Sequence, residues 1–364
     1  YAQKNGKAIR EYLFSDVENA YASTSISILA SHLVNDPVDM AMITGSTTRP
    51  EQFAFFTNDD GTLALFHSVR AEKIAGWTLW STKSGDEFTS ITAVNENLFC
   101  VVKRQLEGGT VYTLEKFAEQ DDLTLDCSGT TTVNQQGTPL VNGASQTGTS
   151  LNVDGYSTAP NTGDVITIAG ITGSYEIQTV TATASGHTVV LDQALASSPA
   201  DNAAITITSG RVHNSPAHLT QETVNAVDGT FSLGSFTTSA SDTITFDVAH
   251  SAGVIIGFNY EPSLETMPID REVQNGPLTG QIKRISRAVI DLSDSLNVAL
   301  QAADSTAKSL VIRDVAFDVA APVAKVTGKK EFFFLGYDRE PTLKITQTAP
   351  LPLKVLGVAL EVVF

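Results

Sequence analysis

The chain has 364 residues with 23 Lys and Arg against 40 Asp and Glu, which gives a formal net charge of −17. This acidity argues against a protein that grips nucleic acid through its phosphates, because that mode of binding needs clustered Lys and Arg. The apolar fraction of 42% can build folded cores. The length exceeds the roughly 250–300 residues at which a single core stops growing, so two or three domains are expected.

The cysteine content and the apolar runs narrow the class of protein further. Cys100 and Cys127 cannot make a disulfide framework, so free thiols in a protein made in a reducing cytoplasm are expected. No apolar run approaches the ~18–20 residues of a membrane span, and the N-terminus lacks the pattern of a signal peptide. Because the sequence has no initiator Met and Tyr1 leads directly into an expected strand, we expect it to be part of a longer polypeptide.

Residues 1–118 are expected to form short strands at regular spacing. Residues 7–14 alternate in the manner of a strand, whereas the apolar spacing within residues 23–33 predicts a short helix. Asp60-Gly61 is a hairpin signal. Further strands are expected at 38–44, 52–57, 62–69, 76–81, 88–94, 98–103 and 111–117.

These strands form a repeat. A strand, a DG turn, a second strand and an outer strand occupy about 40 residues around positions 52–82, and a similar set begins near Phe88. Units of four strands and ~40–45 residues are the period of β-propeller blades. The sequence therefore predicts partial propeller blades, and two blades need others to close a ring.

Composition changes near Glu119. Residues 128–209 are rich in Thr, Ser, Gly and Asn with almost no Lys or Arg. Their short alternating strands predict a small β-barrel or sandwich, taken here as a barrel inserted at 119–210 with its flanking linkers. Low-complexity disorder is the alternative for residues 128–149 alone. Residues 211–364 are expected to form an antiparallel β-rich platform domain, in which the apolar residues 355–364 predict a central strand. The predicted fold class is all-β.

The motifs of common enzymes are missing from the sequence. It contains no phosphate-binding loop, dinucleotide fingerprint, H-E-x-x-H, C-x-x-C or G-x-S-x-G. We therefore predict no catalytic, cofactor-binding or metal-binding residues and no enzymatic activity.

Weaker candidates for a metal site or a carboxylate pair each have a simpler interpretation. His213 and His218 could present two metal ligands, but two linker histidines are the favoured interpretation. Residues 58–61 resemble the start of a calcium loop without the Glu at its twelfth position, so a hairpin turn is favoured. Asp59 with Asp86 or Glu87 could form the carboxylate pair of a glycosidase, yet any acidic β-protein offers many such pairs.

Two further groups could bind a ligand. Trp77 and Trp80 could stack on a sugar, but their spacing places them on opposite faces of a strand, and structural packing is favoured for both. Lys325, Lys329 and Lys330 form a mild basic patch that could meet phosphate, with a solvated turn as the favoured interpretation.

The order of several segments resembles the tail nozzle family, or tail tubular protein B, of short-tailed bacteriophages. The resemblance covers roughly 280 residues and leaves out the insertion, whose G-D-V-I-T-I-A-G at 163–170 resembles small β-barrels that decorate phage structural proteins. The segments that carry the nozzle resemblance are K-A-I-R-E-Y at 7–12, Y-A at 21–22, L-A-S-H-L at 29–33, T-N-D-D-G-T-L at 57–63, G-W at 76–77, V-V-K-R at 101–104, E-K at 115–116, I-G-F-N-Y-E-P-S-L-E-T-M-P at 256–268 and P-L-P-L-K-V-L-G at 350–357.

This resemblance implies a structural virion protein in the tail, assembled in the host cytoplasm. It implies a homohexameric ring that docks on the tail adaptor and portal ring, contacts tail fibres or spikes, and retains and then conducts double-stranded genomic DNA without sequence-specific binding. The alternatives are a host-surface or glycan-binding tail protein that uses the inserted barrel as its binding module, and a tail-associated depolymerase. For a nozzle, the charge of −17 predicts acidic residues along the lumen and basic residues at subunit and adaptor contacts.

Overall fold

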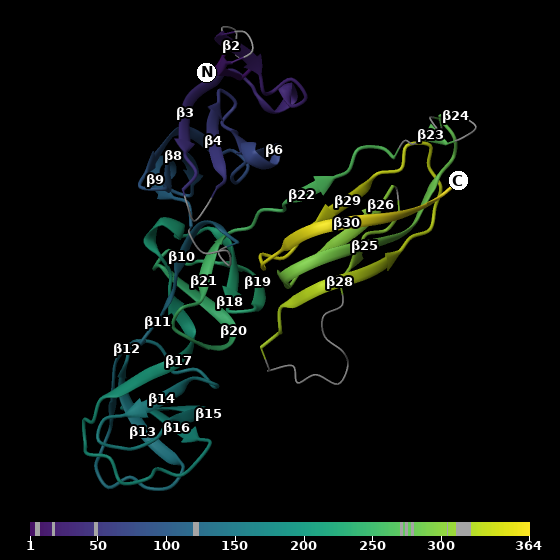
Figure 1. Ribbon diagram of the computed structural model, residues 1–364. Helices are drawn as coiled ribbons and strands as arrows, with labels where there is room; N and C mark the ends of the chain where they lie inside the picture. The colour runs from purple at the N-terminus through teal and green to yellow at the C-terminus, as the bar shows by residue number, and fades with distance from the viewer. Residues whose placement is uncertain are drawn as a thin grey trace. The chain divides into compact units, whose positions relative to one another are not determined.

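The computed structural model is all-β, as the sequence predicts. It describes residues 1–3, 8–16, 19–46, 50–118, 124–269, 272–273, 276–277, 280–303, 305–310 and 322–364. Within these ranges the helices are three short 3-10 segments, namely η1 (Ser31–Leu33), η2 (Arg70–Glu72) and η3 (Ala217–Leu219). The chain divides into two compact units, unit 1 (Tyr1–Asp126) and unit 2 (Cys127–Phe364) (Figure 1).

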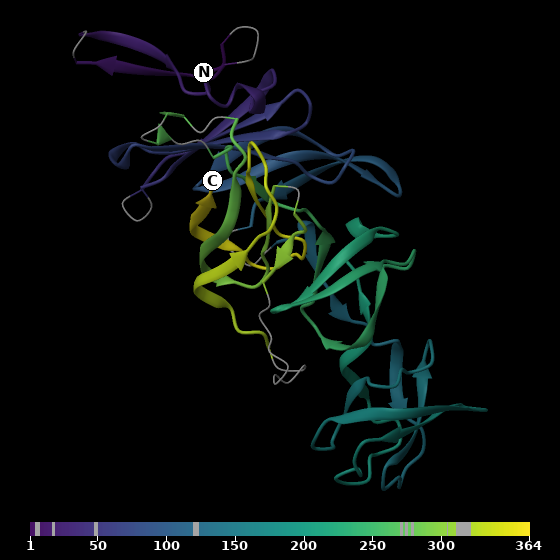
Figure 2. The ribbon, with the colours of Figure 1, turned by 90° about the vertical axis from the view of Figure 1, so that its right-hand side faces the viewer.

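Unit 1 consists of a hairpin and two antiparallel sheets whose strands follow chain order. The hairpin pairs β1 (Arg10–Ser15) with β2 (Ala20–Ser25) (Figure 2). The first sheet contains β3 (Pro37–Ile43), β4 (Gln52–Asn58), β5 (Leu63–Val69) and β6 (Ile74–Trp80). The second contains β7 (Glu87–Val94), β8 (Asn97–Leu106) and β9 (Gly109–Lys116). Among the described residues, the second repeat thus has one strand fewer than the first.

The two sheets of unit 1 share an apolar core. Alternate side chains of a strand point to the same face, so Leu63 of the first sheet packs in one cluster with Phe88 and Val102 of the second. A polar contact also joins the sheets, because Asp39 on β3 accepts a hydrogen bond from the backbone N–H of Ile91 on β7 at 3.0 Å. The sheets are therefore stacked face to face.

The segment of the chain before β3 covers the other face of the first sheet. Ile9 and Val34 pack there with Phe56, and Trp77 joins this cluster and donates from Nε1 to the carbonyl of Ile26 at 2.9 Å. On the opposite face of β6, the ring of Trp80 contacts Phe55 and Phe117. The predicted structural packing of both tryptophans is confirmed.

Two local predictions have different outcomes. The hairpin turn at 58–61 is confirmed: Gly61 has φ +78°, and Asp60 Oδ1 accepts from the backbone N–H of Thr62 at 3.0 Å. The helix predicted over residues 23–33 is wrong, because the chain stays in β2 to Ser25 and then makes only the 3-10 segment η1. Ser27 accepts from the N–H of Ile9 at 2.9 Å, and Ser, Thr and Ile are weak helix formers.

Unit 2 begins with a sheet that curls back on itself. Its strands are β11 (Thr132–Val133), β12 (Gly137–Val141), β13 (Ser150–Tyr156), β14 (Val165–Ile168), β15 (Tyr175–Thr183), β16 (Gly186–Leu191), β17 (Ile205–Asn214) and β20 (Thr243–Ser251). The order is β11-β17-β14-β15-β16-β13-β12, and β20 also pairs with β17. A bridge between Leu140 and Ala204 brings β12 beside the start of β17, as the teal region of Figure 1 shows.

The curled sheet encloses its own core. Leu151, Ile166 and Val189 are fully buried within it. Gly186 has φ +146°, and a Cβ there would lie 2.2 Å from the carbonyl oxygen of Val153. Only glycine permits this close crossing of two strands.

The rest of unit 2 forms further antiparallel sheets. One contains β10 (Asp126–Thr130), β21 (Ile255–Phe258), β18 (Thr223–Asp228) and β19 (Phe231–Thr237) in that order. A second contains β22 (Ser263–Glu265), β29 (Leu343–Thr346), β26 (Ala299–Ala302) and β27 (Lys308–Ser309). A third contains β28 (Val326–Phe333), β25 (Arg284–Ser295) and β30 (Lys354–Val363), and β23 (Glu272–Val273) pairs with β24 (Gly276–Pro277). Ile290 and Leu300 lie in one core shared by the second and third sheets.

The position of β30 corrects a prediction. It lies at an edge of its sheet and pairs only with β25 among the described strands, so the predicted central position is wrong. Apolar alternation reports which faces of a strand are apolar, and not how many neighbours it has. In the parts of the chain that the structure describes, no helix is long and apolar enough to cross a membrane.

Candidate functional site

The most elaborate polar cluster in unit 1 surrounds Arg104 near the end of β8. The period of two along this strand places Arg104 on the same face as the buried Leu98, Cys100 and Val102. Its side chain is 0% exposed. A guanidinium that is fully removed from water must find acceptors for its five N–H groups within the protein.

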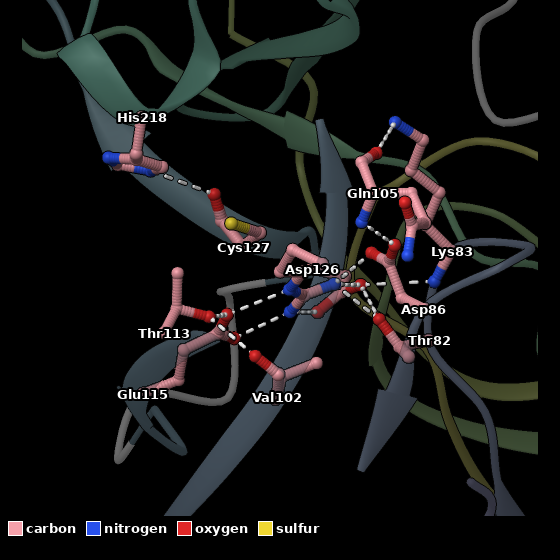
Figure 3. Close-up of polar contacts among 11 residues, drawn as sticks. Thr82, Lys83, Asp86, Val102, Gln105, Thr113, Glu115, Asp126, Cys127 and His218 are labelled. Carbon is pink, nitrogen blue, oxygen red and sulfur yellow. Dashed lines mark hydrogen bonds and ion pairs between the residues drawn. The ribbon is translucent and has the colours of Figure 1, made fainter. Parts of the chain in front are cut away.

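Glu115 on the neighbouring strand β9 binds Arg104 with both carboxylate oxygens. Nε donates to Oε1 at 2.8 Å and Nη2 donates to Oε2 at 2.5 Å (Figure 3). Thr113 donates its hydroxyl to Oε1 of Glu115 at 2.6 Å. The planar fork of Arg and the carboxylate match in this bidentate arrangement.

Asp126 supplies a second pair of acceptors from the end of unit 1. Arg104 donates from Nη1 to Oδ2 at 2.7 Å and from Nη2 to Oδ1 at 2.8 Å. Oδ2 also accepts from the hydroxyl of Thr82 at 2.5 Å and from the backbone N–H of Lys83 at 3.3 Å (Figure 3). Asp126 therefore joins the segment after β6 to Arg104.

Asp86 completes the cluster from the loop before β7. Its side chain is fully buried; Oδ2 accepts from Nη1 of Arg104 at 3.0 Å, and Oδ1 accepts from the backbone N–H of Gln105 at 2.7 Å. The hydroxyl of Thr82 is a further acceptor for Nη1. Arg104 thus draws together the loop before β7, both strands β8 and β9, and the start of β10.

The electrostatics of the cluster favour its ionised form. Burial opposes the charge of Asp126, but the hydrogen bonds and charge of Arg104 outweigh it and hold the pKa of Asp126 below its ordinary 3.8. Burial likewise opposes the charge of Arg104, yet its hydrogen bonds to Asp126 and Glu115 raise the pKa of the guanidinium above 12.5. All five Arg104 hydrogens have acceptors, so this arrangement joins strands and offers no group for proton transfer.

A second buried polar centre lies in unit 2 around His213 on β17. Nε2 lies 3.0 Å from the carbonyl oxygens of Gly210 and His250, and Nδ1 lies 2.9 Å from Oγ1 of Thr131. Carbonyls only accept, so Nε2 carries the hydrogen and Nδ1 accepts from the Thr131 hydroxyl. Burial is the largest cause that lowers the pKa of His213 below 6.5, so the ring is neutral at pH 7.

The structure gives His213 and His218 separate partners. Nε2 of His218 lies 3.2 Å from the backbone oxygen of Cys127, whereas both nitrogens of His213 are occupied as described above. Within the described residues, no group of three or more His, Cys, Asp or Glu side chains could hold a metal ion.

The carboxylate pair considered from the sequence is divided among other partners. Asp86 belongs to the Arg104 cluster, and Glu87 pairs with Lys103 at 3.0 Å. The interpretation of 58–61 as a turn also holds, with Asp60 bonded to Thr62 and to Asn35.

Two further predictions concern the basic patch and the cysteines. Lys329 and Lys330 lie on β28, and not on the predicted turn, because Asp291 and Ile290 of β25 pair with them. Cys100 and Cys127 are free thiols, as predicted. Burial, with the charge of Glu115, raises the pKa of Cys100 to about 12, so this thiol is unreactive at neutral pH.

Sequence reasoning missed the Arg104 cluster, although one signal was present. Alternation along residues 98–104 places Arg104 on the buried face of its strand, and a buried cation requires carboxylates nearby. The hairpin register places Arg104 opposite Val111 and Glu115 opposite Cys100, so it puts Glu115 on the same face as Arg104 but does not make the two residues direct neighbours. Asp126 comes from beyond the sheet and has no comparable signal in the sequence.

Comparison of the sequence with protein families and with curated proteins identified no relative of this chain. No protein-family model matches the chain, and no curated protein matches it in sequence.

Proposed function

We propose that this chain is a structural subunit of a bacteriophage tail nozzle, without enzymatic activity, that assembles into a ring and retains and then conducts double-stranded DNA. In this proposal, the two sheets of unit 1 are blades of an incomplete β-propeller. The resemblance of ordered segments is the starting point, and several of them fall on these sheets: G-W at 76–77 on β6, V-V-K-R at 101–104 on β8 and E-K at 115–116 on β9.

One observation supports an assembly subunit most strongly, namely the apolar side chains that unit 1 leaves exposed on its sheets. Val38, Met40 and Met42 point from one face of β3, and Tyr112 and Leu114 point from one face of β9; each of these five residues is at least 45% exposed. Soluble monomers rarely expose contiguous apolar patches of this kind, and such patches mark interaction surfaces. Subunits in a ring would cover them.

Electron microscopy of the purified full chain tests the proposal. Six-fold particles with a central channel, alone or with an adaptor and portal ring, are the expected result. A protein that stays monomeric at every concentration and never enters particles overturns it. In a reconstruction, a strongly basic lumen would contradict the prediction that acidic residues of this chain, with its charge of −17, line the channel.

Deletion of most of the curled sheet separates the nozzle from the host-binding alternative. A variant in which a short linker replaces residues 136–208, which keeps His213 and the pairing of β17 with β20, is expected to assemble into particles that still adsorb to the host. If particles assemble but no longer adsorb, the curled sheet is the binding module, and this result supports the host-binding alternative.

A further inference from the structure

The third sheet of unit 2, in the order β28-β25-β30, has two free edges among the described strands (Figure 1). Its middle strand β25 alternates between buried and half-buried residues over most of its length, whereas β30 is exposed on both faces over residues 354–359. Leu356 is 69% exposed, and Val355 and Val358 are each 36% exposed. The strand β30 therefore presents a long apolar edge to its surroundings.

This edge lacks the devices that protect a free strand. Natural proteins place Lys or Pro on such strands, because the row of unpaired N–H and C=O groups otherwise pairs with another chain. Residues 355–360 contain neither a charge nor a Pro. Glu361, which follows them, is bound by Nε of Arg287 on β25 at 3.0 Å. The free edge of β30 is thus suited to the addition of a strand.

The opposite edge of the same sheet, formed by β28, carries positive charge. Lys329 and Lys330 are exposed on this strand, and the adjacent Glu331 lies 3.5 Å from Nη1 of Arg287. In a chain with a net charge of −17, the strand is a locally basic strip. Two acidic copies of the chain repel each other over most of their surfaces, so a basic strand is a favourable place for them to meet.

We propose that the free edge of β30 pairs with the free edge of β28 in a second copy of this chain, so that the sheet continues from one copy to the next. Both strands run antiparallel to β25, so they are parallel to each other within one chain. A rotation about an axis along the strands preserves this direction, and the new pair is parallel. Two different edges meet at the contact, which is therefore head-to-tail and can close into a ring.

The part of the β28 edge that a second copy can reach ends before Phe333. The carbonyl oxygen of Phe333 already accepts a hydrogen bond from Nζ of Lys308 on β27. Among the described residues, the unoccupied edge of β28 is therefore residues 326–332, a length that suits the ten residues of β30.

The side chains of the two edges are complementary in size. Across β25, Gly357 lies level with Lys329 and Ala359 lies level with Glu331, so all four residues share one face of the sheet. The small residues of β30 leave room beside them for the long side chains of β28 from the second copy. Small and large residues on neighbouring strands favour close packing.

The number of copies rests on the proposed function, whereas the pairing of the edges does not. Three strands from each of six copies would close a barrel of about 18 strands, which is wide enough to leave an aqueous channel. The second sheet packs on one face of the third. The other face, on which Arg287 contacts Glu331 and Glu361, would line the channel, and a polar lining suits a water-filled interior.

Disulfide trapping of the full chain tests the pairing. Cys127→Ser removes one native thiol from the background, and the other, Cys100, is buried. Within one chain β25 separates β28 from β30 by about 9–10 Å, which exceeds the reach of a disulfide, so a bond between them joins two copies. We expect a ladder of covalent multimers on a non-reducing gel from Ala359→Cys combined with at least one of Thr327→Cys, Lys329→Cys, Glu331→Cys and Phe333→Cys.

A charge on the free edge should block the pairing. Leu356→Lys is expected to weaken self-association at least about tenfold in sedimentation equilibrium, because Lys protects an edge against strand addition. Since Leu356 is largely exposed, thermal unfolding of the variant should match that of the native chain. Met267→Lys, at a residue that is 84% exposed and lies outside the described strands, is the matched control and should leave association unchanged.

The outcomes separate this pairing from the proposed function. If Ala359→Cys alone gives covalent dimers, two β30 strands pair with each other and the head-to-tail contact is wrong. If the native chain forms six-fold particles but no double variant is trapped and Leu356→Lys assembles normally, the pairing is wrong and the nozzle stands. A ladder from particles of another symmetry supports the pairing and overturns the nozzle, and a chain that stays monomeric overturns both.

Discussion

The two buried polar centres, around Arg104 in unit 1 and around His213 in unit 2, satisfy their polar groups by opposite means. Arg104 keeps a full charge and surrounds it with three carboxylates, whereas His213 is neutral and uses a hydroxyl and two backbone carbonyls. The charged centre depends strongly on each of its partners. It stays ionised at neutral pH, because the pKa of Arg104 is raised and that of Asp126 is lowered. A neutral centre costs less to bury, but its histidine has a pKa below 6.5 and takes up a proton only at acid pH.

Loss of the cation is the largest expected effect in this comparison. Arg104→Met leaves three carboxylates without their buried partner, and we expect unit 1 to lose about 3–5 kcal/mol of stability. Thermal and urea unfolding of the variant measure this loss. Adding Asp86→Leu and Glu115→Leu to the same chain should restore part of the stability, and a loss below about 1 kcal/mol in the single variant would contradict the model.

Removal of the hydroxyl donor at the neutral centre should have a smaller effect. Thr131→Val keeps the shape of this buried side chain but leaves Nδ1 of His213 without a donor, which we expect to cost about 1–3 kcal/mol. Urea unfolding of unit 2 measures the change. Thr223→Val at an exposed cross-strand position is the control. Equal effects of the two substitutions would show that the hydrogen bond from Thr131 to His213 does not stabilise unit 2.

The pH dependence should also distinguish the two centres. His213 has a lowered pKa in the folded protein, so the unfolded chain binds more protons and the stability of unit 2 falls as pH drops below 6.5, by at most about 1.4 kcal/mol per pH unit. Asp126 has a lowered pKa too, but its contribution is present above 3.8 and is lost only below that pH. NMR titration checks the first point: a midpoint of His213 at or above 6.5 would refute it.

The exposed ion pair should have the smallest effect. Glu87 and Lys103 lie 3.0 Å apart with side chains 44% and 29% exposed, where water and salt screen their attraction. We expect Glu87→Gln to leave the melting temperature of unit 1 unchanged within error. A drop comparable to that of Arg104→Met would mean that burial is not what separates the two ion pairs.

Short-range patterns in the sequence were sufficient for much of the fold. Alternation and the Asp60-Gly61 turn predicted the β4–β5 hairpin because both signals act between neighbouring residues. The apolar spacing at 26–33 predicted a helix, but contacts of Ile26 and Val34 with Phe56, distant in sequence, overrode it. The edge position of β30 depends on strand order, which no local pattern reports.

The polar centres were less predictable than the strands for the same reason. His213 and His218 stand close in sequence, yet the partners of His213 come from Thr131 and His250 on other strands. Spacing alone therefore grouped the wrong residues. The burial of Arg104 followed from alternation, but the arrival of Asp126 needed the path of the chain in three dimensions.

The pairing of β11 with β17 has a consequence for how this chain could change over time. Thr132 lies opposite Asn214 and Val133 opposite His213, so the strands that lead into and out of the curled sheet are hydrogen-bonded neighbours. The residues between these two strand ends therefore leave and rejoin unit 2 at adjacent points, and the end of β17 stays paired with β20 at residues 209–214. A segment joined in this way can be exchanged for another, or lost, while the rest of the fold keeps its geometry.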